Sequence, residues 1–171
     1  MNINDLLLKL IVNCEKIRNE LMYSHGWISK ENINAEWVAS LERNDPLKER
    51  FSAFCARFGR MQDYFSDKLI VVWVEVVGEN PGTALENFSV AEKAGILTIK
   101  SEELPGLRKL RNDLTHDYID DYDFLSGRLR LAIKASVNYS DMLDNLEKYC
   151  QDTLGMTIPN DTMAHGQTRM R

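Results

Sequence analysis

The chain has 171 residues, of which 44% are hydrophobic and 27% are charged, with 21 Lys and Arg against 26 Asp and Glu. This length and this apolar fraction predict one domain with a continuous core, and they argue against disorder along the chain. The net charge of −5 excludes a protein that coats nucleic acid through phosphate contacts. Any nucleic acid must therefore bind at a local site.

Cysteine spacing and hydropathy exclude further classes of protein. The chain has an odd number of cysteines, and they are far apart in sequence: Cys14, Cys55 and Cys150. This pattern favours buried thiols in a reducing compartment over disulfides or a zinc site. The longest apolar run, Leu69 to Val74, is far shorter than the ~20 residues that cross a bilayer. The first residues lack the basic segment and the cleavage site of a signal peptide. We therefore expect a soluble, cytoplasmic protein.

The first half of the chain predicts two long helices with a loop and a short helix between them. Apolar residues at spacings of three and four predict a helix from Ile3 to about Met22, which His25-Gly26 would end. Residues 27–44 predict the loop and the short helix. Asp45-Pro46 has the chemistry of a helix start, because Asp caps free N–H groups and Pro is tolerated at N1. The next helix carries an aromatic-rich stripe: Phe51, Phe54, Phe58, Met61 and Phe65.

The end of this second long helix is ambiguous in sequence. Leu69 to Val77 is so rich in β-branched residues that a buried strand fits the run as well as a helix does. We prefer a helix, because the upstream spacing of three and four continues into the run with no turn signal before it. The chain is then broken by a cluster of turn residues: Gly78, Asn80, Pro81 and Gly82.

Two further helices are predicted from their capping chemistry. The capping-box pattern occurs twice, in Thr83-Ala84-Leu85-Glu86 and in Ser89-Val90-Ala91-Glu92. We expect one helix to contain both patterns and to end at Gly95. Ser101 can cap the next helix, which runs through Leu114. Both helices are short compared with those of the first half.

The last helix is predicted from about Tyr122, and Gly155 would close it. We expect its broad apolar face to consist of Phe124, Leu125, Leu129, Ala132, Ile133, Val137, Met142, Leu143 and Leu146. The elements together predict an all-α fold, an antiparallel four-helix bundle with one or two additional short helices. We expect a single helical domain over residues 1–155 and a flexible tail over residues 156–171.

One segment concentrates side chains that can do chemistry. Within eight residues it contains a guanidinium, an amide, an imidazole and a phenol. The full segment is Arg108-Lys109-Leu110-Arg111-Asn112-Asp113-Leu114-Thr115-His116-Asp117-Tyr118. Asn112 and His116 are four apart and can share a helix face, where the amide would hold the imidazole in one tautomer. Arg111 and His116 would lie about 140° apart around a regular helix. A two-fold dimer could bring two such pairs into one cleft.

This segment resembles the signature of HEPN domains, small helical domains named for nucleotide binding in higher eukaryotes and prokaryotes. Arg111-Asn112 followed by three residues and His116 matches the R-polar-x3-5-H pattern. With Tyr118 it also fits the narrower R-x4-H-x-Y form of HepT-type toxins. Phe58-Gly59-Arg60-Met61-Gln62-Asp63-Tyr64 is similar to the family's second-helix segment, and the helix order fits over roughly residues 3–150. A HEPN-like bundle is therefore expected.

The resemblance implies a metal-independent ribonuclease that acts as a homodimer and uses no cofactor. Arg111 and His116 would be its catalytic residues, and Asn112 would orient the imidazole. An imidazole can accept the proton of a ribose 2′-hydroxyl or protonate the leaving 5′-oxygen. A guanidinium can stabilise the negative charge that grows on the phosphate oxygens. The expected substrate is RNA and not DNA, because the attack uses the 2′-hydroxyl.

The resemblance also implies a partner. In the paired-toxin branch of the family, a minimal nucleotidyltransferase of the MNT type transfers AMP to the motif Tyr and so silences the nuclease. Tyr118 is the matching residue, and an added anion there would repel the RNA backbone. The chain would thus be the toxin of a HEPN/MNT toxin–antitoxin pair. Residues 27–44 and the tail after Gly155 look like additions relative to many members of the family.

Two other functions fit the same residues. One is a non-catalytic subunit that binds a nucleotide or a nucleotidyltransferase partner through the motif, and the other is a dimeric helical scaffold without activity. Structural roles are open as well. Arg111 could pair with a carboxylate on another helix, His116 could favour a helix C-terminus in its charged form, and Tyr118 could pack its ring.

The other charged residues near the motif have similar alternatives. Four acidic residues fit a cap for the helix near Tyr122 better than a metal site, since no His or Glu lies at ligand spacing. These residues are Asp117, Asp120, Asp121 and Asp123. Six basic residues surround them and leave a local basic patch open: Arg108, Lys109, Arg111, Arg128, Arg130 and Lys134.

Overall fold

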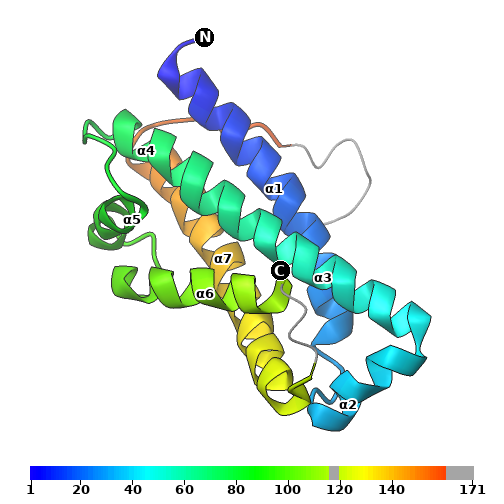
Figure 1. The fold of residues 1–171 in the computed structure, drawn as a ribbon. Helices are drawn as coiled ribbons and strands as arrows, with labels where there is room; N and C mark the ends of the chain where they lie inside the picture. The colour runs from blue at the N-terminus through cyan, green and yellow to red at the C-terminus, as the bar shows by residue number, and fades with distance from the viewer. Residues whose placement is uncertain (116–119, 161–171) are drawn as a thin grey trace.

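The computed structural model describes residues 1–115 and 120–160 of the chain. Within these ranges every regular element is helical (Figure 1), which confirms the predicted all-α bundle. The α-helices are α1 (Ile3–Ile28), α2 (Ala35–Ser40), α3 (Asp45–Tyr64), α4 (Ile70–Val76), α5 (Ala84–Lys93), α6 (Leu104–Thr115) and α7 (Tyr122–Asp152). No helix in the described ranges combines the length and the apolarity needed to cross a bilayer.

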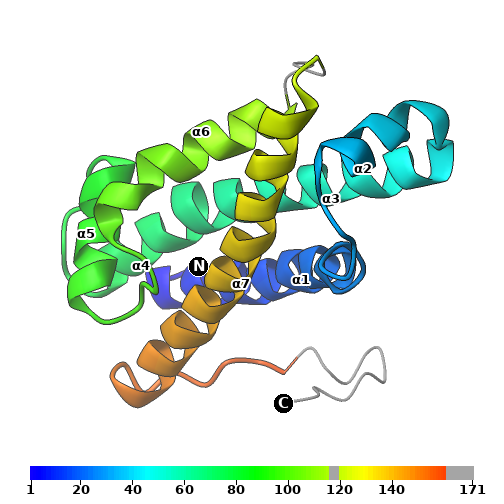
Figure 2. The ribbon, with the colours of Figure 1, turned by 90° about the horizontal axis from the view of Figure 1, so that it is seen from below.

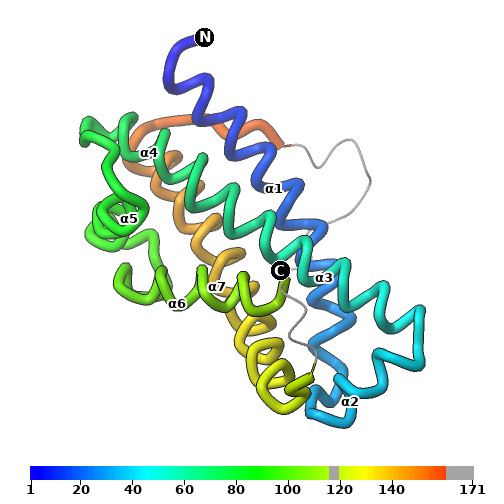
Figure 3. Tube along the Cα trace, viewed as in Figure 1, coloured from blue at the N-terminus to red at the C-terminus, as the bar shows by residue number. Residues whose placement is uncertain are grey.

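Three short elements join these helices. A π turn, Phe65–Leu69, connects α3 to α4, and two 3-10 turns, Leu41–Arg43 and Ser101–Glu103, precede α3 and α6. Figure 3 follows the unbroken path of α3, the π turn and α4 along one side of the bundle. The β-branched run Leu69 to Val77 is therefore helical up to Val76, as predicted, and the wide turn at its start was not predicted.

The long helices pack around a shared core. α1 contacts both α3 and α7, and α6 lies against α3 and α7 (Figure 2). At the centre, the fully buried ring of Tyr139 meets Phe58 and Phe65 edge-on, with centroid distances of 6.2 and 5.8 Å. Tyr139 was absent from the predicted core face of α7. Phe124 and Val137 were included in that face wrongly, because they are 44% and 39% exposed.

The first helix is six residues longer than predicted. α1 continues through His25 and Gly26 and ends at Ile28, so Gly26 does not end it. The reason is burial: Ile28 is fully buried, and the Arg50 guanidinium lies 5.1 Å from the centre of the Trp27 ring. Burying one large aliphatic side chain contributes about 1.5–3 kcal/mol, which exceeds the ~1 kcal/mol cost of a glycine inside a helix.

Several predicted helix ends are confirmed. The Thr83 hydroxyl accepts from the Glu86 N–H at 3.2 Å while the Glu86 carboxylate accepts from the Thr83 N–H at 2.7 Å, which completes a capping box. Gly95 follows α5 at φ +78°, in the left-handed region where glycine is favoured. Asp121 accepts from the Phe124 N–H at 2.9 Å and caps α7. The acidic residues before α7 thus include the expected cap.

Two predicted caps were placed wrongly. Asn44, and not Asp45, caps α3, because its side chain accepts from the Leu47 N–H at 3.1 Å. Ser89 lies inside α5, which Thr83 caps, so the two capping patterns share one helix as predicted. Ser101 lies in the 3-10 turn that precedes α6 and ends at Glu103, and its backbone N–H donates to Glu92 Oε2 at 2.6 Å. Each error displaces a boundary by a few residues and leaves the helix order unchanged.

The chain beyond α7 is described as far as residue 160. Met156 and Ile158 are partly buried against the core, so the start of the segment predicted as a flexible tail is packed. Residues 161–171 lie outside the described part of the chain. The same core cluster includes side chains of all seven α-helices.

The continuous helix through Gly26 predicts a gain in stability on substitution. A Cβ added at Gly26 would meet no atom within 4 Å. We expect Gly26→Ala to raise the free energy of unfolding by about 0.5–1 kcal/mol, because alanine loses less backbone entropy in a helix. Gly95→Ala is the matched control and should lower it by about 1–2 kcal/mol, because its φ is positive. Urea denaturation followed by circular dichroism measures both. A loss of stability in Gly26→Ala would contradict a helix that continues to Ile28.

Candidate functional site

The motif begins on the last two turns of α6. Leu110 and Leu114 are buried on the core side of this helix, and Arg111 and Asn112 lie between them in sequence. His116 and Tyr118 lie outside the described residues, so their predicted roles stay predictions. The described part of the site consists of Arg111, Asn112 and the side chains that contact them.

Arg111 is held against α3 by a carboxylate. Its Nη2 donates to Asp63 Oδ2 at 2.7 Å, and the side chains of Arg111 and Asp63 are 35% and 47% exposed. Its Nη1 lies 3.4 Å from the side-chain oxygen of Asn112. Its Nε is buried and has no hydrogen-bond acceptor among the described residues. The carboxylate partner that the sequence left open for Arg111 is thus Asp63.

A glycine makes room for this guanidinium. Gly59 is buried in the middle of α3, one helical turn before Asp63. A Cβ added at Gly59 would lie 3.1 Å from Arg111 Nε and 3.5 Å from its Cγ. The Arg111 side chain therefore lies directly on the backbone of α3, and a Cβ at Gly59 would require the guanidinium to shift by a few tenths of an ångström.

A second ion pair joins the same helices one turn further along. Arg108 on α6 donates to Asp67, which lies in the π turn between α3 and α4. The later aspartate, Asp67, pairs with the earlier arginine, Arg108, whereas the earlier aspartate, Asp63, pairs with the later arginine, Arg111. α6 therefore runs antiparallel to α3 along a two-step row of ion pairs.

A third ion pair joins α6 to α7. Asp113 Oδ2 and Arg128 Nε lie 2.9 Å apart, with side chains only 17% and 20% exposed, although the two groups are not aligned as a hydrogen bond. The Arg128 guanidinium also lies 5.8 Å from the centre of the Phe124 ring. Low exposure reduces solvent screening, so this pair holds the end of α6 against the start of α7.

These contacts neutralise much of the basic cluster that the sequence shows around the motif. Arg108, Arg111 and Arg128 each pair with an aspartate, and Arg130 Nη1 donates to the Ile33 carbonyl at 2.9 Å. In the described ranges, Lys109 and Lys134 make no ion pair. Among the described residues of the cluster, only the two lysines thus lack such a partner, and the charge at Arg111 is local.

Two residues of the site were not singled out as site residues from sequence. Asp63 and Gly59 are both in the segment that resembles the second helix of HEPN domains, but neither was assigned a role. The available signal was Gly59 itself, because a glycine lowers the stability of a helix interior and a packing contact is one reason for its presence there. Within the described residues, no three His, Cys, Asp or Glu side chains gather as metal ligands would.

Comparison of the chain with family models, with curated proteins and with solved structures found no match in any of the three.

Because of the contact between Gly59 and Arg111, we expect substitution by alanine to change stability differently at Gly59 and at Gly106. Gly106 is an exposed glycine of α6 whose added Cβ would meet nothing within 4 Å, so Gly106→Ala should stabilise the protein by about 0.5–1 kcal/mol. Gly59→Ala should not show this gain, because its Cβ displaces the Arg111 Nε. Urea denaturation compares the two variants, and the NMR signal of the Arg111 Nε–H should shift only in Gly59→Ala. Equal stabilisation by both would contradict the close contact.

Proposed function

We propose that the chain is a HEPN-type ribonuclease, the toxin of a toxin–antitoxin pair, and that it cleaves RNA as a homodimer. Arg111 and His116 would do the chemistry, and Asn112 would orient the imidazole. The proposal is supported by one observation in particular. The guanidinium of the motif Arg is fixed at a partly exposed position by Asp63, at the end of a helix in an all-α bundle. A preorganised cation is what stabilisation of a phosphorane-like transition state requires.

The reaction uses groups that the motif contains. The ribose 2′-oxygen attacks phosphorus and its proton passes to an imidazole, while the bond from phosphorus to the 5′-oxygen breaks and that oxygen takes a proton from a second imidazole. The products are a 2′,3′-cyclic phosphate and a 5′-hydroxyl. The two imidazoles come from the two His116 residues of the dimer, and Arg111 stabilises the charge on the non-bridging oxygens.

Variants of the motif test the catalytic part of this proposal. We expect His116→Ala to lower the rate of RNA cleavage by about 100-fold or more, because proton transfer is lost. Arg111→Lys keeps the charge but loses the planar fork, and it should lower the rate by about 10-fold or more. Cleavage of total RNA by the purified protein, followed on gels, measures both.

The control for these variants is Arg60→Ala, since Arg60 is an exposed cation of α3 that pairs with Glu20 on α1. It should cleave RNA at the unmodified rate. Circular dichroism shows whether each variant is folded. Full activity in folded His116→Ala or folded Arg111→Lys would rule out the mechanism.

A non-catalytic subunit is the second candidate, and one observation favours it. The Arg111 guanidinium already pairs with Asp63, which is what a purely structural arginine would do. Under this alternative the motif docks a nucleotidyltransferase and RNA is not cleaved.

Regulation separates the two candidates. We expect intact-mass analysis, after co-expression with a nucleotidyltransferase encoded beside this gene, to show the addition of AMP. The addition should disappear in Tyr118→Phe and persist in Tyr64→Phe, which changes another tyrosine. AMP on Tyr118 with loss of RNA cleavage supports the toxin. A stable complex without a mass change, from a chain that does not cleave RNA, supports the binding subunit.

A further inference from the structure

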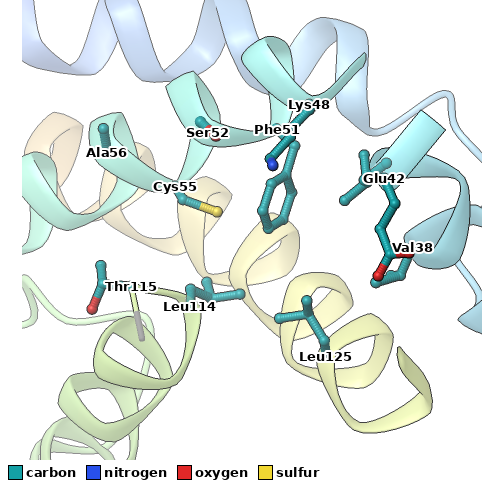
Figure 4. Close-up of a pocket in the computed structure, with 11 residues that line it drawn as sticks. Val38, Glu42, Lys48, Phe51, Ser52, Cys55, Ala56, Leu114, Thr115 and Leu125 are labelled. Atoms are coloured by element: carbon teal, nitrogen blue, oxygen red, sulfur yellow. The ribbon is translucent and has the colours of Figure 1, made fainter. Parts of the chain in front are cut away.

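A cavity of about 410 Å³ lies beside the C-terminal end of α6 (Figure 4). Its walls come from α3, from α2 and the turn after it, and from the facing ends of α6 and α7. Six of its lining residues are apolar and largely buried: Val38, Leu41, Phe51, Cys55, Leu114 and Leu125. Figure 4 shows the Phe51 ring and the Cys55 sulfur pointing into the space, opposite Leu114 and Leu125.

The size and lining of this cavity suit an apolar ligand. Ligand sites usually enclose about 300–1,000 Å³, and an apolar cavity of about 150 Å³ already binds benzene. A cavity of this size therefore holds a bicyclic ring. Water inside it would find few hydrogen-bond partners on the apolar walls, so an apolar molecule replaces that water favourably. Burial raises the pKa of the Cys55 thiol to about 12, which keeps the thiol neutral beside such a ligand.

Two charged side chains line the cavity, and they differ in their partners. Glu42 accepts a hydrogen bond from the hydroxyl of Tyr122. Lys48, on α3, makes no ion pair within the described residues. The carboxylate therefore already has a donor, whereas the ammonium is available to an anion. A ligand that carries one negative charge would complete the pairing at Lys48.

We propose that this cavity binds a compact apolar carboxylate of about the size of a bicyclic aromatic acid. The ring body packs against Phe51, Leu114 and Leu125, and the carboxylate pairs with Lys48. This inference goes beyond the proposed ribonuclease activity and does not rest on it. An occupied cavity would also support the last turn of α6, because Leu114 and Thr115 belong to the lining.

A matched pair of probes tests the charge. The isotope-labelled full chain is titrated with 2-naphthoate and with 2-naphthamide, which has the same rings without the charge, and amide signals are followed by NMR. We expect both probes to shift Phe51, Cys55 and Leu114, with the acid binding about five-fold more tightly. Lys48→Met should remove this advantage. Lys93→Met, an exposed lysine of α5 outside the cavity, should preserve it.

Two variants that place a large side chain over the cavity, called filled variants, test the position of the site. Ala56 and Ser52 line the cavity at exposed positions of α3, so Ala56→Trp and Ser52→Trp place an indole over the mouth. Binding of both probes should be lost in whichever of these variants retains the circular dichroism of the parent. Unchanged binding in a folded filled variant, shifts away from the lining, or equal affinity for acid and amide would overturn the proposal.

Discussion

The close approach of Arg111 to the backbone of α3 sets the position of α6, and with it the start of the motif. A half-exposed ion pair contributes only about 0–1 kcal/mol, so the pairing with Asp63 has little weight as a source of stability. Its effect is geometric, because the Arg111 side chain lies against the α3 backbone at Gly59 and its guanidinium is directed toward Asp63. The second pair, between Arg108 and Asp67, then fixes how α6 runs along α3.

The sequence predicted what depends on local chemistry and missed what depends on contacts across the fold. Spacing of apolar residues located the helices, and the Thr83 box and the Asp121 cap were found because a cap involves neighbours only. The end of α1 was missed because burial of Ile28 outweighs the cost of Gly26. Asp63 was missed as the partner of Arg111 because 48 residues separate them.

Part of the excess negative charge of the chain lies beside the arginines of the motif region. Aspartates on three elements pair with Arg108 and Arg111 of α6 and with Arg128 of α7, so part of the negative charge lies where these helices meet. In the described residues around the motif, these pairs leave little positive charge to attract a polyanion. A cleft shared by two chains doubles the number of motif arginines, which is a physical reason for the proposed ribonuclease to act as a dimer.

The π turn explains how one helix keeps facing the core over its whole length. Buried residues recur every four positions from Gln62 through Ser66 and Ile70 to Val74. On a regular helix, twelve steps of ~100° overshoot three full turns by about 120°, which would rotate Val74 out of the core. Eleven steps on the same regular helix would exceed three full turns by only about 20°, which would keep the last residue on the buried side. The wider turn thus accommodates one extra residue, and it also contains Asp67, the partner of Arg108. A chain that lacked Asp67 could keep this row of residues buried on a regular helix, but it would lose the ion pair that joins α6 to the turn.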